Sequence, residues 1–201
     1  ARKRILALVT DYGLQVDQHA MAQIAQSSAQ GGTNPDKMVE SLKRVAGRTK
    51  TRLHVLYEID NREVESDIKA YNRIVKKTKV TPEYPLRGGY VSFQQFLTMC
   101  DATTLTAVRA KGSNYDRFKK SIHDKIDEGI PLLWALQVGV IKEKGIPQAG
   151  GGHMRLITGY NEKTDEIIYT DSWGPGHEYK RMKTTDAFTP SMHLITIKPS
   201  S

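Results

Sequence analysis

The chain has 201 residues, enough for one well-packed domain but few for two independent ones, and no apolar run approaches the roughly 20 residues of a transmembrane helix. Its hydrophobic content of 38% and charged content of 26% are ordinary for a globular protein. Since no apolar run is long enough, we expect no membrane span. The net charge of +8 comes from basic residues spread along the chain among acids, so we expect no specific nucleic-acid site either.

The N-terminal quarter of the chain predicts three helices. Apolar residues recur at helical spacing within residues 1–13, and Gly13 stands where that helix should stop. Asp17 is a suitable N-cap for a second helix, and Asn34-Pro35 supplies a cap and a first-turn proline for a third. We therefore expect a helical lobe over residues 1–50.

The middle of the chain mixes one strand with several helices. Residues 51–59 alternate as a strand does, and Asp60-Asn61 then opens a helix that runs to about Lys77. After a Pro- and Gly-containing loop, Ser92 opens a short helix, and residues 113–129 form a strongly amphipathic helix that ends at a glycine.

The C-terminal part of the chain is rich in strands. The expected elements are a strand in 130–140, a hairpin of 153–160 and 167–171, a strand in 177–182, a short helical turn in 184–191 and a closing strand in 192–197. Because helices come first, strands come mostly last and no βαβ repeat is present, the order predicts a single α+β domain over 1–201 with a β-rich lobe at 130–201.

The hairpin carries the most informative pair of residues. His153 begins its first strand and Asp171 ends its second, so antiparallel pairing puts both at the same end. An odd number of residues in the connecting loop would place the two side chains on one face, whereas an even number would place them on opposite faces. On one face, the carboxylate would accept a hydrogen bond from one imidazole nitrogen and leave the other free. The alternative is that both residues merely end strands.

The neighbouring residues suit a reactive histidine. Gly150, Gly151 and Gly152 would let a substrate backbone come close, and the indole of Trp173 could screen a His-Asp hydrogen bond from water. A flexible loop and a core tryptophan would explain the same residues without any chemistry.

The segments GGHMRLITGYN and IIYTDSWG, within residues 151–174, resemble the His and Asn/Asp segments of papain-like cysteine peptidases, in particular the bacterial bacteriocin-peptidase-like branch. The resemblance implies a papain-like α+β fold with its active cleft between a helical and an antiparallel β lobe. It implies a peptide or protein substrate, with His153 as general base, Asp171 as its orienting carboxylate and Trp173 as its screen. Gly151 and Gly152 would support substrate binding.

The nucleophile is the residue that the resemblance does not supply. In the family the cysteine begins the first helix, which is entered here at Ala1, so we expect it upstream of Ala1 and regard the chain as catalytically incomplete. Cys100, the only cysteine, lacks an activating context and has Asp101 beside it, and we expect it to be inert. Glu143 and Lys144 are interpreted as a solvated charge pair.

The histidines show no metal-binding spacing, and no cofactor is expected. Two other functions stay open: a peptidase-like binding module without a nucleophile, and another acyl-transfer reaction on the same scaffold. Secretion is an expectation for this family branch, and cleavage specificity and oligomeric state are not legible in the sequence.

Overall fold

The computed structural model describes residues 51–86, 91–146 and 149–199, together with residues 26, 37, 40, 41, 43 and 44. The first expected helix and, apart from Gln26, the second lie outside these residues; Gln26 is in a turn with φ +52°. The third is represented by five helical positions between 37 and 44. In the described part of the chain, no helix is both long and apolar enough to cross a membrane.

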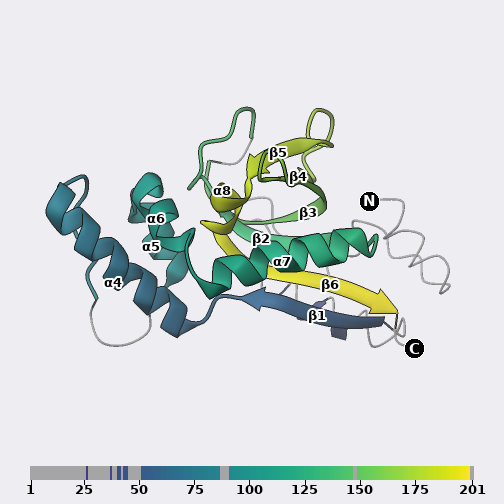
Figure 1. Ribbon diagram of the computed structural model, residues 1–201, viewed down its shortest axis with the longest axis horizontal. Coiled ribbons are helices and arrows are strands. Elements are labelled where there is room, and N and C mark those ends of the chain that lie inside the picture. The colour runs from purple at the N-terminus through teal and green to yellow at the C-terminus, as the bar shows by residue number, and fades with distance from the viewer. Residues whose placement is uncertain are drawn as a thin grey trace.

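The described residues form six strands and five helices, which confirms the α+β class (Figure 1). The strands are β1 (Thr51–Glu58), β2 (Leu132–Val138), β3 (Gly151–Asn161), β4 (Glu166–Thr170), β5 (Lys180–Lys183) and β6 (Ser191–Pro199). The helices are α4 (Asn61–Thr78), α5 (Phe93–Met99), α6 (Ala102–Arg109), α7 (Ser113–Asp127) and α8 (Thr184–Phe188). Helix α6 was not anticipated from the sequence; Asp101 caps it by accepting a hydrogen bond from the backbone N–H of Thr104 at 2.7 Å.

The strands make one antiparallel sheet in the order β1-β6-β2-β3-β4-β5. Strand β1 pairs with β6 along its length, so the sheet takes one strand from outside residues 130–201. Helix α7 packs along one face of the sheet through Phe118 and Ile122, as its amphipathic pattern predicts (Figure 1). This face buries the larger core, to which α8 also contributes.

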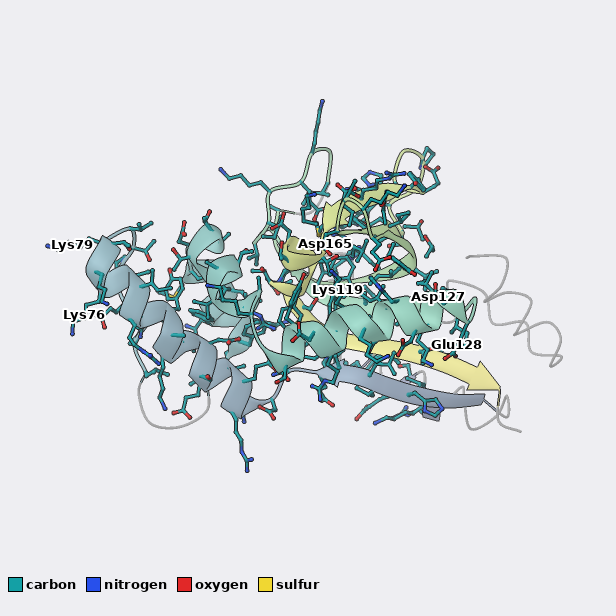
Figure 2. All side chains as sticks on the ribbon, in the orientation of Figure 1. Lys76, Lys79, Lys119, Asp127, Glu128 and Asp165 are labelled. Carbon is teal, nitrogen blue, oxygen red and sulfur yellow. The ribbon has the colours of Figure 1, made fainter. Side chains whose placement is uncertain are left out.

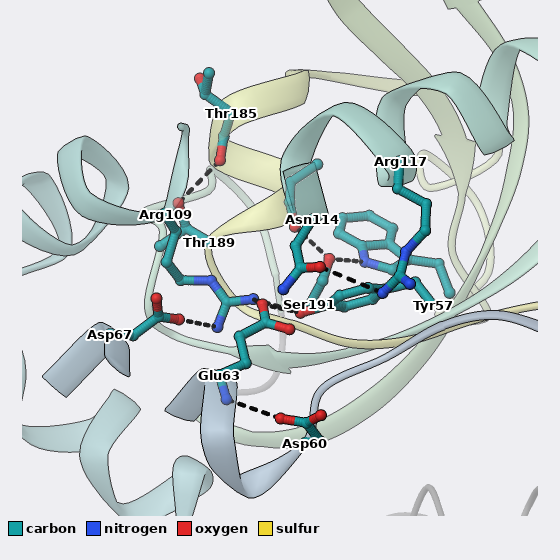
Figure 3. A network of polar contacts seen from close by, with 12 residues as sticks. Tyr57, Asp60, Glu63, Asp67, Arg109, Asn114, Arg117, Thr185, Thr189 and Ser191 are labelled. Carbon is teal, nitrogen blue, oxygen red and sulfur yellow. Dashed lines mark hydrogen bonds and ion pairs between the residues drawn. The ribbon is translucent and has the colours of Figure 1, made fainter. Parts of the chain in front are cut away.

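A second, smaller core lies among α4, α5 and α6, beside the sheet (Figure 1). Arg109 joins it to the larger core, and its side chain is wholly buried. The guanidinium lies 3.2 Å from Glu63 and 3.2 Å from Asp67, and it donates to the hydroxyl of Tyr57 at 2.7 Å (Figure 3). It also lies 4.7 Å from the ring centre of Phe188. A buried cation with two carboxylate partners thus ties α6 to α4 and to the sheet.

The tip of the β3–β4 hairpin is anchored to α7. Lys119 of α7 lies 2.7 Å from the carboxylate of Asp165 in the turn (Figure 2). The carbonyl of Asp165 accepts a hydrogen bond from the backbone N–H of Thr184 at 2.9 Å. Partial burial opposes ionisation of Asp165, but the Lys119 contact outweighs it and lowers the pKa of this carboxyl. The hairpin that carries the candidate site is therefore held at both its turn and its neighbouring strands.

Candidate active site

The β3–β4 loop has an even number of residues, 162–165, which by itself would put His153 and Asp171 on opposite faces. A β-bulge corrects this. The register runs from Asn161 opposite Glu166 to Gly159 opposite Ile168, and it then shifts between Ile157 and Gly159. Thr158, which is exposed, is the extra residue.

The shifted register decides which side chains meet. Beyond the bulge, Ile157 faces Tyr169, so continuing the ladder places Arg155 opposite Asp171. His153 is two residues before Arg155 and therefore points to the same face as Asp171. The bulge, rather than the loop length, brings the histidine and the aspartate together.

His153 and Asp171 form a hydrogen-bonded pair. Nε2 of His153 contacts Oδ1 of Asp171, and the backbone N–H of Ser172 donates to the same oxygen at 3.2 Å. The side chain of Asp171 is fully buried, whereas that of His153 is 11% exposed. Since Nε2 contacts the carboxylate, Nδ1 is left without a hydrogen-bond partner among the described residues and is the atom available to a reacting group.

The ionisation of Asp171 is favoured despite its burial. Desolvation would raise the pKa of this carboxyl, but the hydrogen bond from His153 and the charge of Arg155 outweigh it, and the pKa is lowered from its usual value. The carboxylate can thus stabilise an imidazolium at His153.

Trp173 covers one face of the imidazole. Its ring is nearly parallel to that of His153, with centroids 4.2 Å apart and an interplanar angle of 8°. The ring of His177 meets Trp173 edge-on at 5.7 Å. The loop that carries Trp173 is closed by the backbone N–H of Asp171, which donates to the carbonyl of His177 at 2.8 Å, and by the N–H of His177, which donates to Gly174 at 3.2 Å. The indole is thus stacked on the imidazole of the His-Asp pair.

Gly151 and Gly152 lie immediately before His153 at the start of β3. They pair with Val138 and Gln137 of β2 and are partly exposed. Gly151 has φ +114°, a conformation that residues with a side chain rarely adopt. Both glycines therefore leave the backbone beside the histidine accessible on one side of the site.

Sequence reasoning missed Arg155, and its interpretation of Glu143 was wrong. Arg155 is wholly buried, with Nε 2.9 Å from Oδ2 of Asp171 and Nη1 2.9 Å from Oε1 of Glu143. Glu143 is not solvated, since only 9% of its side chain is exposed, and it also accepts a hydrogen bond from Tyr169 at 2.5 Å. The spacing of Arg155 two residues after His153 on one strand was the signal that could have indicated a shared face.

Cys100 is not brought to this site. It caps the C-terminus of α5 and packs against the smaller core. Helix α5 lies away from β3 and β4 (Figure 1). Its thiol is half-buried and donates to the carbonyl of Leu97 at 3.5 Å. Burial, together with the charge of Asp101, raises its pKa to about 11. Such a thiol is almost entirely protonated at neutral pH and is a poor nucleophile.

Among the described residues, two other kinds of site are relevant, a metal centre and a surface cavity. These residues contain no group of three or more His, Cys, Asp or Glu side chains placed to hold a metal ion. A surface cavity of about 650 Å³ is lined by residues 55–61 and Arg117, and it shares no residue with the His153 site.

Residues 9–192 match the model of the Peptidase_C39 like family. A comparison with curated proteins gave no match.

Proposed function

The chain belongs to the Peptidase_C39 like family, and from this membership and the site geometry we propose that it is the His-Asp part of a cysteine peptidase that hydrolyses peptide bonds. The observation that carries the proposal is the His153–Asp171 pair, which engages Nε2 and leaves Nδ1 for a thiol. We further propose a papain-like arrangement, with a helical lobe facing the β lobe, and membership of the bacteriocin-peptidase-like branch.

In this mechanism His153 and Asp171 act on a thiolate. His153 takes the proton of the thiol at Nδ1, and the resulting imidazolium is stabilised by Asp171. The thiolate attacks the peptide carbonyl carbon, the C–N bond breaks, and the imidazolium gives its proton to the leaving amine. Water, deprotonated by His153, then hydrolyses the thioester and regenerates the thiol.

The remaining site residues support this chemistry. Trp173 excludes water from one face of the His-Asp pair, which strengthens that hydrogen bond. Gly151 and Gly152 let the backbone of a peptide or protein substrate approach His153 closely.

In this proposal the nucleophile would be a cysteine upstream of Ala1. There it would begin the first helix expected from the sequence, where the helix dipole and the imidazolium would lower the pKa of a thiol. Cys100 does not serve, because it lies at a different core and its pKa is raised by burial.

An electrophilic thiol probe applied to the protein with its upstream residues tests the proposal. We expect labelling of the upstream cysteine at neutral pH, its loss in His153→Ala and its retention in Cys100→Ser, the control. Undiminished labelling in His153→Ala would show that the histidine does not activate the thiol.

A second candidate is a peptidase-like binding module, favoured by the fact that the one thiol in the chain is half-buried and unactivated. The upstream sequence separates the two functions: a cysteine within about ten residues of the first helix supports the enzyme, and its absence supports the binder. Another acyl-transfer reaction would be recognised by transfer of the acyl group to an added amine instead of water.

A further inference from the structure

Glu143, Arg155 and Asp171 form a chain of buried charges that ends at His153. Arg155 lies 2.9 Å from Asp171 and 2.9 Å from Glu143, and none of the three side chains is more than 9% exposed. Glu143 comes from the segment between β2 and β3, so the chain of contacts connects a loop to the hairpin.

Aromatic rings surround the guanidinium of Arg155 and increase its dependence on the two carboxylates. The guanidinium of Arg155 lies 4.7 Å from the ring centre of Tyr169, 5.5 Å from that of Trp134 and 5.8 Å from that of Trp173. Rings exclude water, so a cation held among them depends on its carboxylate partners for compensation.

Each oxygen of Asp171 has a separate partner. Oδ1 contacts His153, whereas Oδ2 contacts Arg155. These two contacts fix the rotation of the carboxylate, because turning it would remove both. Without Arg155, Oδ2 would be buried and unpaired.

Glu143 in turn fixes Arg155. Its Oε1 contacts Arg155, and its Oε2 accepts a hydrogen bond from Tyr169 at 2.5 Å and lies 3.4 Å from Nζ of Lys180. Burial, and then this hydrogen bond, raise the pKa of Tyr169, so its phenol stays a donor. Glu143 is thus held in place from two further strands.

The formal charges of the buried residues around His153 nearly cancel. Glu143 and Asp171 contribute two negative charges, and Arg155 and Lys180 contribute two positive charges. The sum is zero when His153 is neutral. A protonated His153 adds one positive charge, which is balanced when a thiolate faces it.

We propose that Glu143 and Arg155 are positioning residues that aim the Asp171 carboxylate at Nε2 of His153 and sustain the imidazolium. This role rests on the proposed function. The titratable and charged groups of the described residues that connect to His153, directly, along this chain of charges or through the ring of Trp173, are Asp171, Arg155, Glu143, Lys180, Tyr169 and His177.

The test is an NMR titration of His153 in the whole chain, which needs no activity. Glu143→Gln removes a negative charge and an anchor of Arg155, and both changes disfavour the imidazolium. We expect the midpoint of His153 to fall by about half a pH unit, roughly a threefold change in its dissociation constant. In Glu143→Asp, which keeps the charge, the midpoint of His153 should stay close to its wild-type value.

The matched control is Glu65→Gln, which removes an exposed carboxylate paired with Lys69 on α4. A His153 midpoint that moves no more in folded Glu143→Gln than in this control would overturn the positioning role. If Glu143→Gln does not fold, Arg155→Lys keeps the charge but loses the two-nitrogen fork. The midpoint of His153 should also fall in Arg155→Lys, and an unchanged midpoint would overturn the positioning role as well.

The two proposals fail in different ways. If the midpoint responds to Glu143 but the protein with its upstream residues is not labelled by a thiol probe, the positioning role stands and the peptidase function fails. If labelling depends on His153 but the midpoint ignores Glu143, the peptidase function stands and the positioning role fails.

Discussion

Asp171→Asn is the substitution that most directly tests the paired carboxylate. It preserves the shape of the side chain but removes its charge. Oδ1 of the carboxylate contacts Nε2 of His153, and Oδ2 forms an ion pair with Nε of Arg155, which lies 2.9 Å away. An amide has a single acceptor oxygen, so one of these two donors would face an NH₂ group.

Either orientation of the amide is costly. If its oxygen faces His153, its NH₂ group meets the guanidinium of Arg155 in a site that is fully buried. If its oxygen faces Arg155, its NH₂ group meets Nε2 of His153, and the imidazole proton moves to Nδ1. A proton at Nδ1 prevents that nitrogen from accepting the proton of the thiol.

The magnitude follows from the bond that is lost. A hydrogen bond to a charged group contributes about 2 kcal/mol, which corresponds to a roughly 30-fold slower reaction with a thiol probe. Leaving buried Arg155 with Glu143 as its remaining carboxylate partner should lower the free energy of unfolding by about 3 kcal/mol. Removing the negative charge beside His153 also disfavours the imidazolium that stabilises the thiolate, so the pH at which probe labelling sets in should move to a higher value.

The assay is the second-order labelling rate of the protein with its upstream residues, measured against pH, with urea unfolding in parallel. Asp124→Asn is the control, because that carboxylate is exposed and pairs with Lys120 on the surface of α7. Labelling of Asp171→Asn within twofold of the wild-type rate at every pH would refute the role assigned to the carboxylate.

Two further predictions concern the shield and the buried charge network. Trp173→Ala should lower kcat/KM about tenfold, because water would reach the His153–Asp171 hydrogen bond. Trp173→Phe should retain most of the activity. Equal values of kcat/KM for Trp173→Ala and the wild type would contradict the screening role. Asp67 is mostly buried, and desolvation, only partly offset by Arg109, raises its pKa to about 6. A raised pKa favours the folded state at low pH, so as pH rises from about 4 to 7 the unfolding free energy of the wild type should fall by up to ~3 kcal/mol relative to Asp67→Asn. Urea unfolding of both proteins across this range checks the difference, and parallel profiles would contradict it.

Local sequence patterns determined several elements without reference to the fold. The amphipathic spacing of residues 113–129 predicted α7, and Asp60 predicted the start of α4, where its side chain accepts from the backbone N–H of Glu63. Apolar strands around a polar turn predicted the hairpin and placed His153 and Asp171 at the same end. These features depend on contacts between residues close in the sequence, so the sequence carries them in its periodicity.

The tertiary structure decided the face and the partners of those residues. The even loop alone would have separated His153 from Asp171, and only the bulge at Thr158 put them on one face, because a single extra residue inverts the alternation of a strand. Glu143 and Arg155 are an unremarkable loop acid and strand base in sequence. They become a buried pair because the sheet and its aromatic side chains exclude water around them, which no local pattern records.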